Sequence, residues 1–293
     1  MLLADIEIHE AATLEKASEL MARYAPDARL LAGGTDLLVD LKTDRLTVSH
    51  VVSIQRIEAL RVIVATDRGL RIGALATANQ LAAAPIVQQR FPAILDATRD
   101  LAAPQIRNRA TVGGNIASAV PSADLPPILT VMNASVILWS PSGEREVPLG
   151  SFFTGPRRTV RREDEILTEI RLPNPPAGFG AAYARFALRE ANACAVAAVA
   201  ASLVLDGNQI VREAHICLGA VAPTPKLLSA ARILLLGKKA EGETLRRAAE
   251  AAMELSQPIS DIRGSADYRR ELIGVLTRRA LVSARQRALG GEQ

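Results

Sequence analysis

Two diglycine segments place the strongest constraint on how this chain can fold. The first lies in LLAGGTDLLVDLK, residues 30–42, and the second lies in ATVGGNIASAVPSADLPP, residues 110–127. A backbone without Cβ atoms adopts positive φ easily and lets a ligand approach its N–H groups. Successive N–H donors in such a turn form a concave anion site, and a following helix adds partial positive charge. Each segment therefore predicts a tight turn or a phosphate-binding loop, and the two together favour a long ligand with two phosphates.

Polar side chains surround both diglycines. After the first, Thr35 supplies a hydroxyl, and Asp36 can cap the next helix or accept a hydrogen bond from a ligand hydroxyl. Around the second, donors and acceptors come from Thr111, Asn115, Ser118 and Asp124. Asp124 stands where it can cap a helix or hold a sugar hydroxyl. Neither segment matches GxGxxG or GxxxxGK[ST], so the residues alone predict a phosphate or nucleotide ligand without identifying it.

Apolar periodicity and helix breakers predict a mixture of helices and strands. We expect strands at residues 28–32, 50–54, 61–73 (a hairpin), 133–149 (a strand–turn–strand), 163–173, 193–205 and 210–221. We expect helices at residues 13–24, 37–42, 226–236, 243–255 and 266–289, with a proline-broken helical region at 79–102. The early succession of strand, helix and strand favours parallel pairing.

A proline- and glycine-rich segment, PNPPAGFG at residues 173–180, is the best candidate for a domain boundary, because it can continue neither sheet nor helix. We therefore expect two domains, at residues 1–175 and 176–293. The first domain is expected to divide into two lobes, at about residues 1–55 and 56–175.

Composition excludes several classes of protein. The chain has 49% apolar and 23% charged residues, a net charge of +4 and only 3% aromatics, which gives little support for nucleic-acid binding. Its longest uncharged apolar run, residues 193–205, is too short to span a bilayer, and no signal peptide is recognisable. Cys194 and Cys217 form no CxxC pair and are expected to be buried, reduced thiols. These observations predict a cytoplasmic protein.

Metal and hydrolase chemistry find little support in the sequence. His9, His50 and His215 are widely separated, without HExxH or a carboxylate at metal-ligand spacing, so each is expected to be satisfied or solvated. No GxSxG elbow occurs.

Two basic segments are expected to face solvent. PRRTVRREDE, residues 156–165, is expected to be a solvated turn, with subunit docking or a phosphate contact as alternatives. The arginines of the last helix are expected to point to solvent, and its core stripe is expected to comprise Tyr268, Leu272, Val275 and Leu276.

Four segments together resemble the flavin subunit of molybdenum hydroxylases, a family that includes the medium subunit of carbon monoxide dehydrogenase and the FAD domain of xanthine dehydrogenase. They are LLAGGTDLL, QIRNRATVGGNIASAVPSADLPPIL, DEILTEIRLP and LGAVAPTPKL. The resemblance implies an α+β fold. A two-lobed FAD-binding domain of the vanillyl-alcohol oxidase and MurB type would precede a smaller domain with an antiparallel sheet and helices.

The resemblance also implies cofactor-binding positions, with the FAD pyrophosphate on the two glycine loops. These positions are Ala32, Gly33, Gly34, Thr35, Asp36, Thr111, Gly113, Gly114, Asn115, Ser118, Asp124, Leu167 and Arg185. Arg185 replaces a lysine found near the flavin in some relatives, and Asn192 replaces an acidic residue often found there. The roles of both are therefore left open. No catalytic residue on this chain is implied.

The family further implies partner subunits. FAD would exchange electrons with [2Fe-2S] clusters on a small subunit, a large subunit would hold the molybdenum cofactor, and a dimer of heterotrimers is expected. The two cysteines fall short of the four thiolates that a cluster ordinarily needs. Two alternatives remain, namely a stand-alone MurB-like flavoenzyme and a non-catalytic nucleotide-binding module. The organic substrate and the final electron acceptor or donor are left open.

Overall fold

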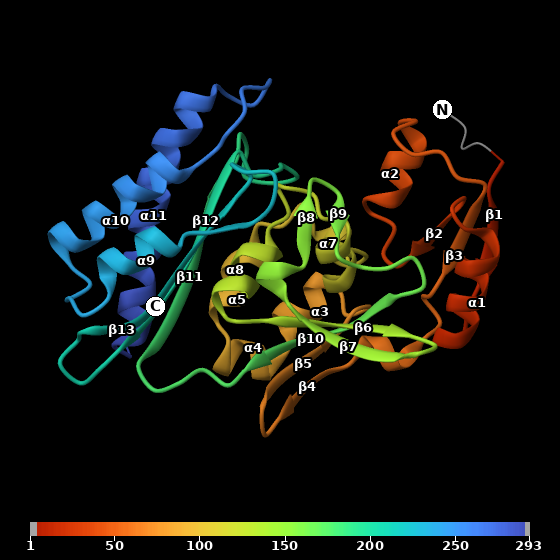
Figure 1. Ribbon diagram of the computed structural model, residues 1–293, viewed down its shortest axis with the longest axis horizontal. Coiled ribbons are helices and arrows are strands. Elements are labelled where there is room, and N and C mark those ends of the chain that lie inside the picture. Colours follow the sequence, from red (N-terminus) through yellow and green to blue (C-terminus); the bar gives the residue numbers. More distant parts are fainter. Residues whose placement is uncertain (1–4, 291–293) are drawn as a thin grey trace.

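The computed structural model describes residues 5–290 of the 293-residue chain and arranges them in three consecutive parts (Figure 1). A small first lobe lies at one end, a larger second lobe lies in the middle, and a C-terminal sheet with three helices lies at the other end. The sheets are formed by strands from separate parts of the chain, with helices packed against them. The predicted α+β fold is confirmed.

The first lobe is a three-stranded parallel sheet with two helices. Its strands lie in the order β1–β3–β2, and its elements are β1 (Glu7–Glu10), α1 (Leu14–Tyr24), β2 (Ala28–Leu31), α2 (Leu37–Lys42) and β3 (His50–Ser53). Helix α1 begins where the Thr13 side chain accepts a hydrogen bond from the Lys16 N–H, at 3.2 Å. Apolar residues of α1 and β3 form the core of this lobe. The first glycine loop leaves the carboxyl end of β2 and leads into α2.

The second lobe is built on a five-stranded antiparallel sheet. Its strands, in the order β4–β5–β10–β6–β7, are β4 (Ile63–Thr66), β5 (Gly69–Gly73), β10 (Ile166–Pro173), β6 (Ser135–Ser140) and β7 (Gly143–Pro148). Between β5 and β6 come α3 (Ala78–Ala83), α4 (Pro85–Arg90), α5 (Ala93–Arg99), α6 (Pro104–Arg107), α7 (Val112–Ala117) and α8 (Leu125–Val131). A short hairpin of β8 (Phe153–Gly155) and β9 (Arg158–Thr159) faces the first lobe (Figure 1). Pro85 and Pro92 break the expected helical region into three helices.

The C-terminal part is a four-stranded antiparallel sheet covered by helices on both faces. It comprises β11 (Phe179–Phe186), β12 (Ala197–Leu205), β13 (Val211–Gly219), β14 (Lys226–Leu227), α9 (Ser229–Leu235), α10 (Gly242–Leu255) and α11 (Ala266–Ala288). Side chains alternate along β11, with Ala181 and Tyr183 in the core of the second lobe and Ala182 in the core beneath α11. The second lobe thus packs on one face of this sheet, and α11 packs on the other.

Small residues permit this close packing. A Cβ atom on Gly180 would lie 3.0 Å from the Ala288 Cα of α11, so α11 can lie directly on β11 only where a side chain is absent. Strand β12 likewise has small side chains in the core, namely the buried Ala197, Ala198, Ala200 and Ala201.

Several sequence expectations differ from the structure. Strand β11 was not expected, because FGAAYARF mixes small, aromatic and charged residues and follows a proline-rich segment. Cys217 is buried, but Cys194 is exposed, because it lies in the loop before β12 and not within the apolar strand. A helix was expected to begin at Lys226, but Lys226–Leu227 forms the short strand β14.

The buried face of α11 also differs from its expected stripe. Tyr268 and Val275 are exposed, whereas Arg269 is buried and bonded to Asp261. The residues that pack inward are Ile273, Leu276, Ala280, Leu281 and Ala284. The ion pair between Arg269 and Asp261, in the loop before α11, therefore determines which side of the first turn of α11 is buried. Apolar periodicity cannot reveal such a pair.

The proposed boundary between residues 175 and 176 lies in the segment that joins β10 to β11. Among residues 5–290, no helix is long and apolar enough to cross a membrane.

Asp96 of α5 joins the second lobe to the C-terminal part. Its carboxylate accepts two hydrogen bonds from Arg287 of α11, at 2.7 and 2.9 Å, and one from the Tyr183 backbone N–H at 3.1 Å. The side chains of Arg287 and Asp96 are only 10% and 15% exposed. Because both are largely shielded from water, losing one partner would leave the other poorly solvated.

Replacing Asp96 with Asn should therefore destabilise the chain by about 2–3 kcal/mol, since Arg287 and the Tyr183 N–H lose a charged acceptor. Urea unfolding of the full chain measures this change. Glu19→Gln, which removes a solvent-exposed ion pair with Lys16, is the matched control and should leave the midpoint unchanged. Equal midpoints for Asp96→Asn and the wild-type chain would contradict the role given to this contact.

Candidate functional site

The two glycine loops meet at the junction of the two lobes. A Cβ atom on Gly33 would lie 2.9 Å from the Arg109 carbonyl carbon and 3.2 Å from the Thr111 nitrogen, and it would overlap the Arg109 carbonyl oxygen. The first loop therefore crosses directly over the backbone that leads into α7. The close approach of the Arg109 backbone thus leaves no space for a side chain at position 33, whether or not a ligand binds there. On the other side of the loop, Gln55 donates to the Ala32 carbonyl oxygen at 2.5 Å.

The first loop has free backbone donors. Within the described part of the chain, the N–H groups of residues 33–36 have no hydrogen-bond acceptor. Gly34 has φ of 79°, the left-handed conformation in which successive N–H groups converge on one side. Residues 33–35 are partly buried, and partly buried N–H groups without a partner are uncommon in folded proteins. This loop is therefore suited to receive an anion such as a diphosphate.

The second loop has the N–H groups of both its glycines occupied. The Gly113 N–H donates to the Ala74 carbonyl at 2.9 Å, and the Gly114 N–H donates to the Thr111 hydroxyl at 3.1 Å. A Cβ on Gly113 would lie 2.5 Å from the Ala74 Cβ, so this glycine lets α7 pack against the chain that follows β5. A Cβ on Gly114 would meet only the Thr111 side chain within 4 Å, so its other side is open. Among the four glycines of the two diglycine segments, Gly33 and Gly34 have N–H groups without an acceptor within residues 5–290, whereas those of Gly113 and Gly114 are occupied, although the sequence suggested a similar role for both segments.

Asp36 faces the second loop. Its side chain makes no cap to α2, which leaves the carboxylate available to another donor. Desolvation raises the pKa of Asp36 and the Asp40 charge adds to the rise, while the nearby Ser118 hydroxyl and the positive charge of Arg157 oppose it. The Ser118 hydroxyl itself donates to the Asn115 carbonyl at 3.2 Å. Asp36 and Ser118 thus bring a carboxylate and a hydroxyl from opposite lobes to one place.

An ion pair holds the lobes together beside this site. Arg157, between β8 and β9, donates through both terminal guanidinium nitrogens to Asp40 of α2, one bond measuring 3.1 Å. Its backbone N–H donates to the Ala119 carbonyl, just after α7, at 2.8 Å. Residues 156–165 were expected to form a solvated turn, but Arg157 in this segment binds Asp40. The two residues are 117 positions apart, so no local sequence pattern could indicate that they pair.

Asp124 and Arg185 bind each other. Arg185 donates to both Asp124 oxygens at 3.3 and 3.4 Å, and the Tyr183 hydroxyl donates to Asp124 at 2.7 Å. Burial raises the pKa of Asp124, while the charge of Arg185 and the hydrogen bond from Tyr183 act to lower it. Burial and the nearby Asp124 charge raise the pKa of Tyr183 well above its usual value. The Asp124 side chain does not cap α8; instead the Asn115 side chain accepts from the Leu125 N–H at 3.4 Å.

Arg185 also orders the loop between β11 and β12. It donates to the Ala193 carbonyl at 3.2 Å and to the Asp100 carbonyl. Asn192 in the same loop has φ of 50°, a left-handed conformation that asparagine tolerates well, and its N–H donates to the Ala102 carbonyl at 3.2 Å. These contacts give Arg185 and Asn192 structural roles at the edge of the second lobe.

Leu167 lies on β10 within the core of the second lobe and is 5% exposed. The strand pairing shifts between Leu167 and Glu169, so a bulge changes the direction of side chains at this point. The backbone near Leu167 thus departs from a regular strand.

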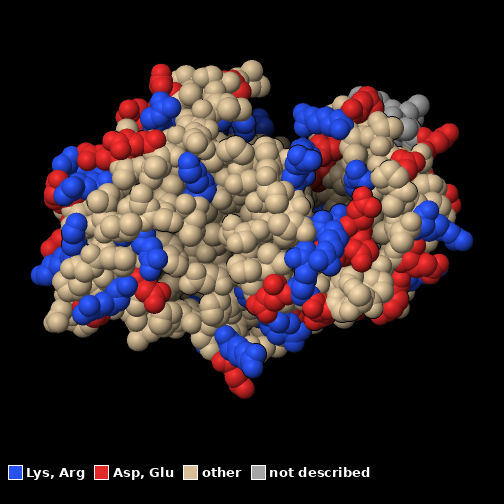
Figure 2. Space-filling view, viewed as in Figure 1, with Lys and Arg blue, Asp and Glu red and all other residues tan. Residues whose placement is uncertain are grey.

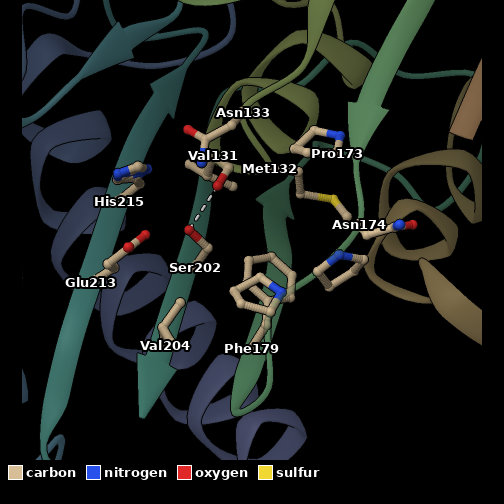
Figure 3. Close-up of a pocket in the computed structure, with 12 residues that line it drawn as sticks. Val131, Met132, Asn133, Pro173, Asn174, Phe179, Ser202, Val204, Glu213 and His215 are labelled. Carbon is tan, nitrogen blue, oxygen red and sulfur yellow. Dashed lines mark hydrogen bonds between the residues drawn. The ribbon is translucent and has the colours of Figure 1, made fainter. Parts of the chain in front are cut away.

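A hollow lies between the first lobe and the body of the molecule, and both basic and acidic side chains lie around it (Figure 2). A different cavity, of about 40 Å³, lies between the second lobe and the C-terminal sheet (Figure 3). It has room for a few water molecules only, and Ser202 donates to the Val131 carbonyl at its wall. Burial, with Arg232 nearby, lowers the pKa of His215 there. This second cavity is too small for a nucleotide.

Comparison with known proteins gives a family for both parts of the chain. Residues 4–175 match the FAD binding domain in molybdopterin dehydrogenase, and residues 181–284 match the CO dehydrogenase flavoprotein C-terminal domain. The carbon monoxide dehydrogenase medium chain of Hydrogenophaga pseudoflava is 37% identical, with 95% of this chain and 96% of that one covered. A putative xanthine dehydrogenase FAD-binding subunit of Escherichia coli K12 is 36% identical, with 97% of each chain covered.

A solved structure agrees with these matches. It is a carbon monoxide dehydrogenase from Hydrogenophaga pseudoflava that lacks the Mo-pyranopterin moiety of the molybdenum cofactor. The present structure superposes on it with a TM-score of 0.94 at 36% identity, covering 97% of this chain and 98% of that one. The first two parts of the chain thus constitute an FAD-binding domain. The chain belongs to the family of FAD-binding medium subunits of molybdenum hydroxylases and is an oxidoreductase flavoprotein subunit. The resemblance found in the sequence is confirmed.

The contact between the loops predicts different effects for two glycines. Gly33→Ala should destabilise the chain by about 2–3 kcal/mol and weaken FAD binding, because the new Cβ forces the loops apart. Gly114→Ala should change stability by no more than about 1 kcal/mol, since a weakened Thr111 cap is offset by better helix propensity. Urea unfolding and FAD titration of each variant measure both effects. Equal stability losses in the two variants would contradict the loop contact.

Proposed function

We propose that the FAD pyrophosphate binds where the two glycine loops meet. The observation that carries this proposal is the set of free N–H groups at residues 33–36, in a family whose matching domain binds FAD. The proposed cofactor-binding residues are Ala32, Gly33, Gly34, Thr35, Asp36, Thr111, Gly113, Gly114, Asn115, Ser118, Asp124, Leu167 and Arg185.

The residues of the site fit such a ligand. The first loop supplies N–H donors for phosphate oxygens, and the open side of Gly114 leaves space for the ligand to approach. Asp36 can accept a hydrogen bond from a ligand hydroxyl, because its side chain does not cap α2. Asp124 and Arg185 are largely satisfied by each other, so in this proposal they shape and order the site more than they contact phosphate.

We propose electron transfer as the activity of this subunit. Bound FAD supplies the redox chemistry, and the protein supplies its position and electrostatic environment. Electrons would pass between iron–sulfur clusters on a small partner subunit and an external acceptor or donor, while a large partner subunit would hold the molybdenum cofactor. Clusters on another subunit are supported by the cysteines of this chain, because there are only two, one exposed (Cys194) and one buried (Cys217), and a cluster ordinarily needs four thiolates. A dimer of heterotrimers in the cytoplasm completes this proposal.

We keep the domain division of residues 1–175 and 176–293 as part of the proposal, with lobes at about 1–55 and 56–175. In this division, the FAD site belongs to the first domain, while Arg185 and Tyr183 reach it from the second.

Purification of the chain from its native cells tests the proposed assembly. The preparation should contain about one FAD per chain, released by denaturation, together with an iron–sulfur protein and a molybdenum protein in stoichiometric amounts. The measurements are cofactor chromatography, metal analysis and native mass. A folded chain that carries FAD but has no metal-containing partner would support the stand-alone flavoenzyme. A folded chain without affinity for FAD would contradict the whole proposal.

A further inference from the structure

The first lobe carries two histidines and a carboxylate that FAD binding does not use. Strands β1 and β3 run parallel with Glu7 opposite His50, and His9 lies two residues further along β1. Glu7 and His9 project to one side because alternate residues of a strand share a face. His9 and His50 therefore meet, although 41 positions separate them in the sequence. Their wide separation in the sequence gave no indication of this contact, in which each imidazole is a hydrogen-bond partner of the other.

The three side chains have a spacing close to that of metal ligands. His9 Nε2 lies 3.1 Å from His50 Nδ1, and Glu7 Oε2 lies 3.6 Å from His50 Nδ1. One ligand atom from each residue lies within 4.8 Å of the other two. Ligand atoms of a tetrahedral zinc ion, with Zn–N of about 2.0 Å, are separated by about 3.3 Å. Small side-chain rotations would therefore suffice to complete the coordination.

Stacking holds the imidazole rings in place. The Tyr24 ring, at the end of α1, stacks on both His9 and His50, with centroid distances of 4.6 and 3.9 Å. The imidazoles are 12% and 22% exposed, whereas the Glu7 side chain is 65% exposed. A metal ion can thus enter from the solvent side, where water can provide a further ligand.

The proton in the His9–His50 contact can be accommodated on metal binding. One ring donates a proton to the other in this contact, and ligation requires both facing nitrogens to be free of protons. The donating ring reaches that state by moving its proton to its other nitrogen. For His9 that nitrogen is Nδ1, which lies 3.8 Å from Glu7 Oε1.

We propose that Glu7, His9 and His50 form a binding site for a divalent transition-metal ion, with zinc as the expected ion. Two imidazoles and one carboxylate suit zinc, copper and nickel better than magnesium or calcium. The bound ion would join β1 to β3 and so stabilise the first lobe, since a ligand that binds only the folded state raises its stability. This site is independent of the FAD loops.

Zinc titration of the full chain tests the site. The chain is produced without a histidine tag, freed of metal with a chelator, and studied by isothermal titration calorimetry and thermal unfolding at equal flavin content. We expect one zinc ion per chain and a raised melting temperature. His9→Gln and His50→Gln should each weaken binding at least about a hundredfold, and Glu7→Gln about tenfold. His215→Gln alters the third histidine, which lies on β13, and should bind zinc as the wild-type chain does.

Circular dichroism of each variant establishes that the fold is retained, and the exposed Glu7→Gln change provides a variant with little risk of misfolding. X-ray absorption of the zinc-bound chain should show nitrogen ligands at about 2.0 Å with imidazole scattering. Absence of stoichiometric binding would overturn the proposal. So would zinc binding of equal strength in the wild-type chain, His9→Gln and His50→Gln.

Discussion

The close approach of Gly33 to the backbone of Arg109 is the contact on which the rest of the site depends. It brings a loop from a parallel sheet against a helix start from an antiparallel sheet, with no room for a side chain between them. The Arg157–Asp40 ion pair also joins the two lobes. Because the first loop is held by its neighbours and not by its own hydrogen bonds, its N–H groups remain free for a ligand.

A second set of contacts joins this site to the C-terminal part. Tyr183 on β11 donates through its backbone N–H to Asp96 and through its hydroxyl to Asp124, and an arginine accompanies each carboxylate. Alternate residues of the same strand contribute to two different cores. The C-terminal sheet therefore packs directly against the second lobe. Substitutions on β11 that move Tyr183 would alter the contacts of Asp124.

Local chemistry made much of the fold predictable from the sequence. Thr13 marks a helix start through its cap, the prolines at 85 and 92 divide helices, and the glycine loops stand out by composition. The long-range features were harder to predict. The pairing of Arg269 with Asp261, the His9–His50 contact and the strand β11 depend on residues that meet only in the folded chain.

The candidate site shows the same division. Its residue types and their order identified the family, yet the sequence could not reveal which amides are free. Gly33 and Gly114 look equivalent in their motifs. In the structure, Gly33 packs so closely on the Arg109 carbonyl that a side chain would not fit, whereas Gly114 lies in α7 with its N–H bonded to the Thr111 hydroxyl.

Hydrogen–deuterium exchange of the full chain, with and without FAD, tests the central claim most directly. The amides of residues 33–36 should exchange rapidly without FAD and become protected on its addition, while those of Gly113 and Gly114 should be protected in both states. Saturating FAD that leaves exchange at residues 33–36 unchanged would contradict the claim that this loop receives the pyrophosphate.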